Sequence, residues 1–130
     1  MFEPLSELIR QRIPGAVAVY AFGSRARGDA MRDSDFDVAI LAARPLEPLF
    51  RWELAQELAA MVHASVDLVD LRRCSTVMRI RVLTDGRLLF DGDRPKRELF
   101  EATTLSEYAR LNEERRGILT DIAARGTVHG

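Results

Sequence analysis

The sequence predicts a small α/β domain that combines a mixed β-sheet with several helices. Two apolar runs, Ala16–Phe22 and Val38–Leu41, have the length and composition of buried strands. A third segment, Ser65–Asp70, alternates apolar and polar residues as a half-buried strand does. Between and after these segments, apolar side chains recur at helical spacing, which indicates amphipathic helices. We expect the helices to pack on one face of the sheet and a functional site to occupy the other.

Length and composition favour a single domain spanning residues 1–130. A chain of 130 residues with 47% hydrophobic residues can bury one core. The formal net charge of −1 offers no basic surface for nucleic acid or anionic lipid. The only cysteine, Cys74, excludes an internal disulfide and fits a reducing compartment. Because the chain has neither a membrane-spanning apolar run nor a signal-peptide pattern, we expect it to be cytoplasmic.

The elements follow in an order set by periodicity and by turn residues. A polar loop at 29–33 separates the first two strands, and its acids Asp29 and Asp33 are expected to be solvated. In the fourth predicted helix, Val77, Ile80 and Leu83 are expected to face inward. The predicted helices are Pro4–Ile13, a turn beginning near Ser24, Leu49–His63, Ser75–Leu83 and Arg94–Arg125; the predicted strands are Ala16–Phe22, Asp35–Leu41, Ser65–Asp70 and Arg87–Asp91.

The last predicted helix, at 94–126, is longer than a domain of this size needs, because at ~1.5 Å per residue it would extend ~45 Å. A domain of this size cannot cover its whole apolar stripe, so part of the stripe is expected to dock on a partner. A break near Gly117, with the end folding back on its own core, is the alternative. The stripe comprises Leu99, Ala102, Leu105, Tyr108 or Ala109, Leu111, Ile118, Leu119, Ile122 and Ala123.

Two carboxylates stand at the start of the second strand. In a strand, residues two apart share a face, so Asp35 and Asp37 point the same way. Phe36, Val38 and Ile40 then point into the core. Paired carboxylates repel each other, and a divalent cation between them relieves that repulsion.

The first strand ends abruptly at Gly23-Ser24. Glycine lets backbone amides approach a ligand, and a helical turn from Ser24 would direct free N–H groups at an anion. Gly-Ser alone or Asp-x-Asp alone would more often belong to an ordinary turn. Both together, each beside a buried strand, indicate a site for a metal–triphosphate complex.

A third acid and two arginines join this constellation. If Val66 and Leu68 pack into the core, strand alternation places Asp67 on the face of Asp35 and Asp37. Asp70 then lies on the opposite face, as a cap or turn residue. Arg25 and Arg27 are candidates for neutralising pyrophosphate, with Arg27 the stronger; that one of them is a surface charge stays open.

At this point the sequence resembles a known family. Gly23-Ser24, ten residues, and then Asp35-x-Asp37 is the signature of polymerase-beta-type nucleotidyltransferases. The shortness of the chain and its tail from Leu105 to Arg116 resemble the minimal nucleotidyltransferase antitoxins, of MntA type, from HEPN–MNT toxin–antitoxin pairs. The resemblance covers nearly the whole chain.

This resemblance implies a polymerase-beta-like fold and a Mg²⁺-dependent adenylyltransferase. It implies an antitoxin that transfers AMP from ATP to a tyrosine of a HEPN-family RNase toxin. In that mechanism Asp35, Asp37 and Asp67 hold two Mg²⁺ ions, while Gly23 and Ser24 bind the β- and γ-phosphates. The preference for ATP rests on the resemblance alone.

The sequence excludes one competing nucleotide-binding motif, the P-loop, but leaves two rival functions open. The Gly23–Gly28 spacing is that of a P-loop, but Asp29-Ala30 replaces the required Lys-Ser/Thr. Two alternatives remain open: a small-molecule nucleotidyltransferase like the aminoglycoside-modifying enzymes, and a non-catalytic antitoxin that acts by binding alone.

Overall fold

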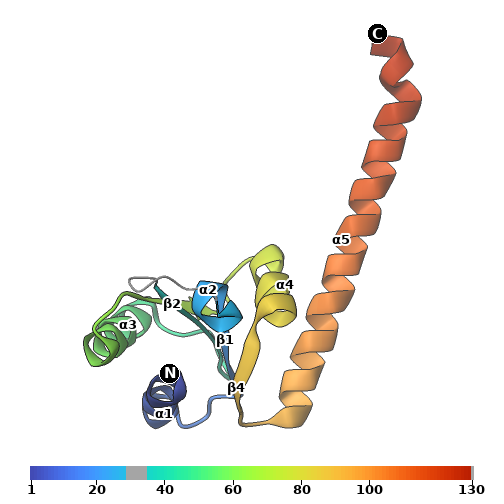
Figure 1. Cartoon of the computed structure of the whole chain (residues 1–130). Coiled ribbons are helices and arrows are strands. Elements are labelled where there is room, and N and C mark those ends of the chain that lie inside the picture. Colours follow the sequence, from blue (N-terminus) through green and yellow to red (C-terminus); the bar gives the residue numbers. More distant parts are fainter. Residues whose placement is uncertain (29–34, 130) are drawn as a thin grey trace.

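The computed structural model describes residues 1–28 and 35–129, with side chains described as far as residue 118. The predicted polar loop at 29–33 lies outside the described residues. Each predicted helix and strand has a counterpart in the structure (Figure 1). In chain order they are α1 Glu3–Arg12, β1 Ala18–Phe22, α2 Gly23–Arg27, β2 Phe36–Leu41, α3 Pro48–Val62, β3 Val66–Asp70, α4 Thr76–Asp85, β4 Arg87–Asp91 and α5 Arg94–His129.

The four strands form one mixed sheet in the order β3-β2-β1-β4. Strand β1 is antiparallel to both β2 and β4, whereas β2 and β3 are parallel. Parallel neighbours need a crossover, and α3 supplies it. Every residue of β1 is buried, as expected for an inner strand that is covered on both faces.

Helices cover both faces of the sheet, so the expectation of helices on one face only was wrong. On the first face, α1 and α3 bury Leu5, Ile9 and Leu58 against Val38 and its neighbours. On the second face, α4 and the start of α5 cover the other side of the same strands (Figure 1). The physical reason lies in β1 and β2, whose side chains are apolar on both faces and need cover on both. The residues buried on the second face are Val17, Ala18, Tyr20, Phe22, Ala39, Leu41, Leu71 and Val82.

Helix α4 is rotated relative to the sequence expectation. Val77 is 69% exposed, whereas Val82 is fully buried. Val82 packs with Phe22 and Ala39 in the core of the second face. The prediction that Val77 faces inward was therefore wrong, whereas Leu83 does pack against this core as predicted. The surface that α4 covers, and not the helix alone, decides which face turns inward.

Helix α5 is continuous from Arg94 to His129 and leaves the domain as a long rod (Figure 1). The alternative of a break near Gly117 is therefore excluded. Polar contacts attach its first turns to the sheet: Arg97 lies 3.0 Å from Asp91 of β4 and is also paired within the helix with Glu101, at 2.7 Å. The Tyr20 hydroxyl donates a hydrogen bond of 2.9 Å to Glu101.

Candidate active site

The parallel pairing of β2 and β3 brings two of the predicted site residues together. Asp37 and Asp67 are direct register partners on the two strands. Their flanking residues, Val38 and Leu68, both point into the core of the first face, so the two carboxylates lie together on the second face. Asp37 is half-buried and Asp67 is exposed.

The electrostatics of Asp37 reflect this arrangement. Burial raises the pKa of the Asp37 carboxyl, and the negative charges of Asp67 and Asp35 raise it further. Asp35 is exposed and immediately precedes β2. Asp67 and Asp35 are thus close enough for their charges to act on Asp37, and the site would favour a bound cation.

The start of α2 lies against Asp37. Gly23 has φ of 75°, in the left-handed region, and a Cβ at this position would overlap the Asp37 carboxylate. Only glycine therefore fits both the backbone conformation and the close approach. Helix α2 ends at Gly28, in left-handed conformation, whose backbone N–H bonds to the Ser24 carbonyl. The five-residue turn that carries Ser24 is fixed at both ends by glycine.

The two predicted arginines have different surroundings. The Arg25 guanidinium lies over the Phe36 ring, 4.0 Å from its centroid. The positive charge of Arg27 lowers the pKa of Asp37, opposing the effects above. The charge of Arg27 therefore reaches Asp37, whereas Arg25 is stacked on an aromatic residue of the core.

Arg81 of α4 is a further cation near the carboxylates. Its charge also lowers the pKa of the Asp37 carboxyl, with a larger effect than that of Arg27. Arg81 was not predicted from the sequence, because it belongs to no motif and lies 44 positions after Asp37. Only the packing of α4 on the second face brings it to the site.

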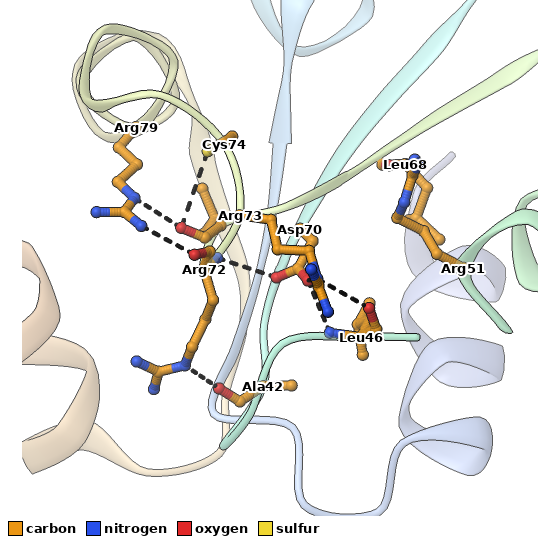
Figure 2. Close-up of polar contacts among 10 residues, drawn as sticks. Ala42, Leu46, Arg51, Leu68, Asp70, Arg72, Arg73, Cys74 and Arg79 are labelled. Carbon is orange, nitrogen blue, oxygen red and sulfur yellow. Dashed lines mark hydrogen bonds and ion pairs between the residues drawn. The ribbon is translucent and has the colours of Figure 1, made fainter. Parts of the chain in front are cut away.

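Asp70 has the turn role expected from its place at the end of β3. Its side chain is buried and accepts hydrogen bonds from the backbone N–H groups of Leu46, at 2.7 Å, and Arg72, at 2.9 Å. Arg72 in turn donates to the Ala42 carbonyl at 2.7 Å. These contacts tie together the segments that follow β2 and β3 (Figure 2). The network therefore holds the strand pair that carries Asp37 and Asp67.

The acidic residues do not form a ready-made metal cage. Within the described parts of the chain, no group of three or more His, Cys, Asp or Glu side chains is placed to hold a metal ion. Mg²⁺ is usually bound by one or two carboxylates together with phosphate oxygens and water. The carboxylate pair beside the Gly23 turn fits that mode, in which the nucleotide supplies the remaining ligands.

None of the described helices is both long and apolar enough to cross a membrane.

Comparison with known families gives the class of protein to which this chain belongs. The profile of the family described as "Polymerase beta, Nucleotidyltransferase" matches residues 3–95. The chain belongs to this nucleotidyltransferase family.

Similar individual proteins show which members of this family the chain resembles. The chain is 45% identical over 118 residues to the protein adenylyltransferase MntA of Shewanella oneidensis, covering 91% of this chain and 84% of that protein. It also matches a crystal structure of a toxin–antitoxin with AMP-PNP, with TM-score 0.81 and 44% identity over 92% of this chain and 95% of the other. A third match is the MNT antitoxin in complex with a tri-AMPylated Shewanella oneidensis HEPN toxin, with TM-score 0.75 and 41% identity over 92% and 93% of the two chains. The resemblance inferred from sequence is confirmed.

Proposed function

We propose that this protein is a Mg²⁺-dependent adenylyltransferase that acts as an antitoxin. It transfers AMP from ATP to a tyrosine of a cognate HEPN-family toxin and so neutralises the toxin. The observation that carries the proposal is the Asp37–Asp67 register pair beside the Gly23 turn. The names of the similar proteins, an adenylyltransferase and an antitoxin seen with an AMPylated HEPN toxin, support the same activity.

The roles of the residues follow from their chemistry. Asp35, Asp37 and Asp67 would hold two Mg²⁺ ions, which supply charge neutralisation for the phosphates and for the attacking oxygen. Asp67 is exposed on the edge strand, where an incoming tyrosine can reach it and give up its proton.

The phosphates would be bound from the start of α2. The backbone amides of Gly23 and Ser24, with the Ser24 hydroxyl, would bind the β- and γ-phosphates. Arg27 would neutralise the leaving pyrophosphate, and Arg25, held over Phe36, would add positive charge at the same turn.

Helix α5 is proposed as the element that docks the toxin. Where it leaves the domain, Tyr108, Leu111 and Ile118 are 36%, 41% and 59% exposed. Tyrosine, leucine and arginine next to one another, here with Arg115 and Arg116, suit an interface in which a few large side chains carry the binding energy. We also place the protein in the cytoplasm, where ATP is available and the single Cys74 would stay reduced.

A non-catalytic antitoxin that only masks the toxin is the second candidate. The observation in its favour is the exposed apolar face of α5 at Tyr108, Leu111 and Ile118, which would suit binding of a partner without chemistry. A small-molecule nucleotidyltransferase is a weaker rival, because such enzymes usually need a second domain or a dimer to build the acceptor pocket.

One experiment separates the three functions. The protein is incubated with α-labelled ATP, Mg²⁺ and the toxin encoded by the neighbouring gene, with Asp37→Asn as the control. The proposal requires label on a toxin tyrosine with the parent and none with the variant. A stable complex without label would establish masking, and label on a small acceptor but not on the toxin would establish the other rival.

A further inference from the structure

Helix α4 lies on the same face of the sheet as the Asp37 carboxylate. Val82 of α4 is fully buried and packs in one cluster with Ala39 of β2 and Phe22 of β1. Asp37 precedes Ala39 by two residues, so the two side chains share a face. Asp37 is also the register partner of Phe22. Helix α4 is therefore next to the carboxylate site.

The end of α4 is held close to the Gly23 turn. Gly86, which follows the helix, is so near β1 that a Cβ there would lie 2.9 Å from the Ala21 carbonyl oxygen. The next residue, Arg87, is paired with Ala21. Ala21 precedes Gly23 by two residues, which places the last turns of α4 beside the proposed phosphate-binding turn.

The orientation of α4 turns Arg81 away from α5. With about 100° between successive helical residues, Arg79 lies about 60° to one side of Val82 and Arg81 about 100° to the other. Arg79 faces α5, because it lies 3.8 Å from Glu107 and 5.5 Å from the centroid of the Phe100 ring. Arg81 is exposed on the opposite side of the helix.

The side away from α5 is the side of the carboxylates. Val82 of α4 packs with Ala39 and Phe22, which are the neighbours of Asp37 on this face of the sheet. Helix α2, by contrast, packs through Ala26 against the core of the first face. Asp37 thus lies between Arg27 on α2 and Arg81 on α4.

We propose that Arg81 is a substrate-binding residue that contacts the triphosphate from the α4 side and neutralises the leaving pyrophosphate. The reason is charge. Two Mg²⁺ ions do not balance three carboxylates and a triphosphate, and negative charge accumulates on the pyrophosphate as the bond to the α-phosphate breaks. An arginine fork matches phosphate oxygens better than any other side chain. Together, Arg27 and Arg81 supply cations from two separate elements.

This inference rests on the proposed nucleotidyl transfer, so its test includes a binding measurement that needs no toxin. We would compare Arg81→Gln and Arg81→Lys with the parent. Arg44→Gln is the matched control, because Arg44 is an exposed arginine after the far end of β2. Fluorescence titrations with labelled ATP and labelled AMP, both with Mg²⁺, measure nucleotide affinity. Transfer assays measure kcat/KM for ATP, and a pull-down measures toxin binding.

We expect Arg81→Gln to weaken ATP binding and to lower kcat/KM for ATP by about 10–100-fold, the loss of a charged hydrogen bond. AMP binding, toxin binding and the Arg44→Gln protein should be unchanged, and Arg81→Lys should recover part of the loss. Unchanged ATP affinity and turnover in Arg81→Gln would overturn the inference, as would a rise in KM for the toxin alone. If the parent binds ATP but labels no toxin, the proposed transfer fails, while the ATP-versus-AMP comparison still decides the role of Arg81.

Discussion

Asp37 of β2 and Asp67 of β3 face each other as register partners in the parallel strand pair. Like charges held side by side are unfavourable, and burial of Asp37 adds to the cost. A protein keeps such a pair where a cation compensates for it. The pair is therefore the feature from which the metal-dependent predictions start.

Removal of the Asp37 charge should separate activity from stability. We expect Asp37→Asn to reduce transfer at least about 100-fold, since even residues that only support metal ligands cost 10–100-fold. In chelator, the free energy of unfolding should be unchanged or slightly higher, because repulsion is relieved. Addition of Mg-ATP should raise the free energy of unfolding of the parent far more than that of the variant. Thermal melts in both conditions measure this, and a marked loss of stability in chelator would give Asp37 a structural role.

The same pair predicts a pH dependence of the metal-free protein. The pKa of Asp37 is raised in the folded state, so folding favours its protonated form. The stabilising contribution is complete below the unfolded pKa of about 3.9 and is lost as the pH rises through the higher folded value. In chelator, the stability of the parent relative to Asp37→Asn should therefore decline as the pH rises above the unfolded value of about 3.9. Urea unfolding of both proteins at rising pH is the measurement, and a constant difference would contradict it.

Substitutions at Gly23 and Gly28 form a matched pair that tests the close approach of the Gly23 backbone to Asp37. Both have positive φ, but a Cβ on Gly28 meets nothing within 4 Å, whereas one on Gly23 overlaps Asp37. Gly28→Ala should cost about 1–2 kcal/mol of backbone strain and leave transfer largely intact. Gly23→Ala should show the same backbone strain and should also abolish transfer. Ser24→Ala, which keeps the backbone amides, should be slower but folded. Equal turnover in all three would remove this turn from the site.

Asp67 and Asp70, three residues apart on β3, should have opposite phenotypes. Asp67 is exposed, so Asp67→Ala should abolish transfer with little effect on stability. Asp70 is 4% exposed and accepts two backbone hydrogen bonds, so Asp70→Ala should cost about 2–3 kcal/mol of folding free energy. Chemical denaturation paired with the transfer assay distinguishes them. A stable, inactive Asp70→Ala would show that Asp70 belongs to the chemistry.

If α5 docks the toxin, substitutions on its exposed apolar face should impair toxin binding and modification but not ATP binding. Tyr108→Ala with Leu111→Ala should leave ATP binding intact and strongly reduce toxin binding and modification, because the acceptor must be held in line with the α-phosphate. Ser106→Ala with Glu113→Ala, exposed on the opposite side of the helix, is the control. Toxin pull-down and nucleotide titration give the two readouts. Normal modification by the first double variant would reduce α5 to scaffold.

The attachment of α5 shows where sequence periodicity gives an incomplete answer. The apolar stripe of this helix was visible in the sequence, yet Leu99 and Leu105 are 68% and 51% exposed. The helix packs instead through Arg97, Glu101 and the buried Thr104. Periodicity defines the faces of a helix, but the partners available on the neighbouring surface decide which face packs.

The sequence by itself determined the local part of the proposed site. Strand alternation places Asp35 and Asp37 on one face, and the Gly23-Ser24 turn precedes them by few enough residues for the motif to be recognised. The tertiary structure decided the rest. The pairing of Asp37 with Asp67 depends on the parallel register of two strands, and the position of Arg81 depends on the burial of Val82. Both are set by burial of apolar surface between segments far apart in the chain, which no local pattern encodes.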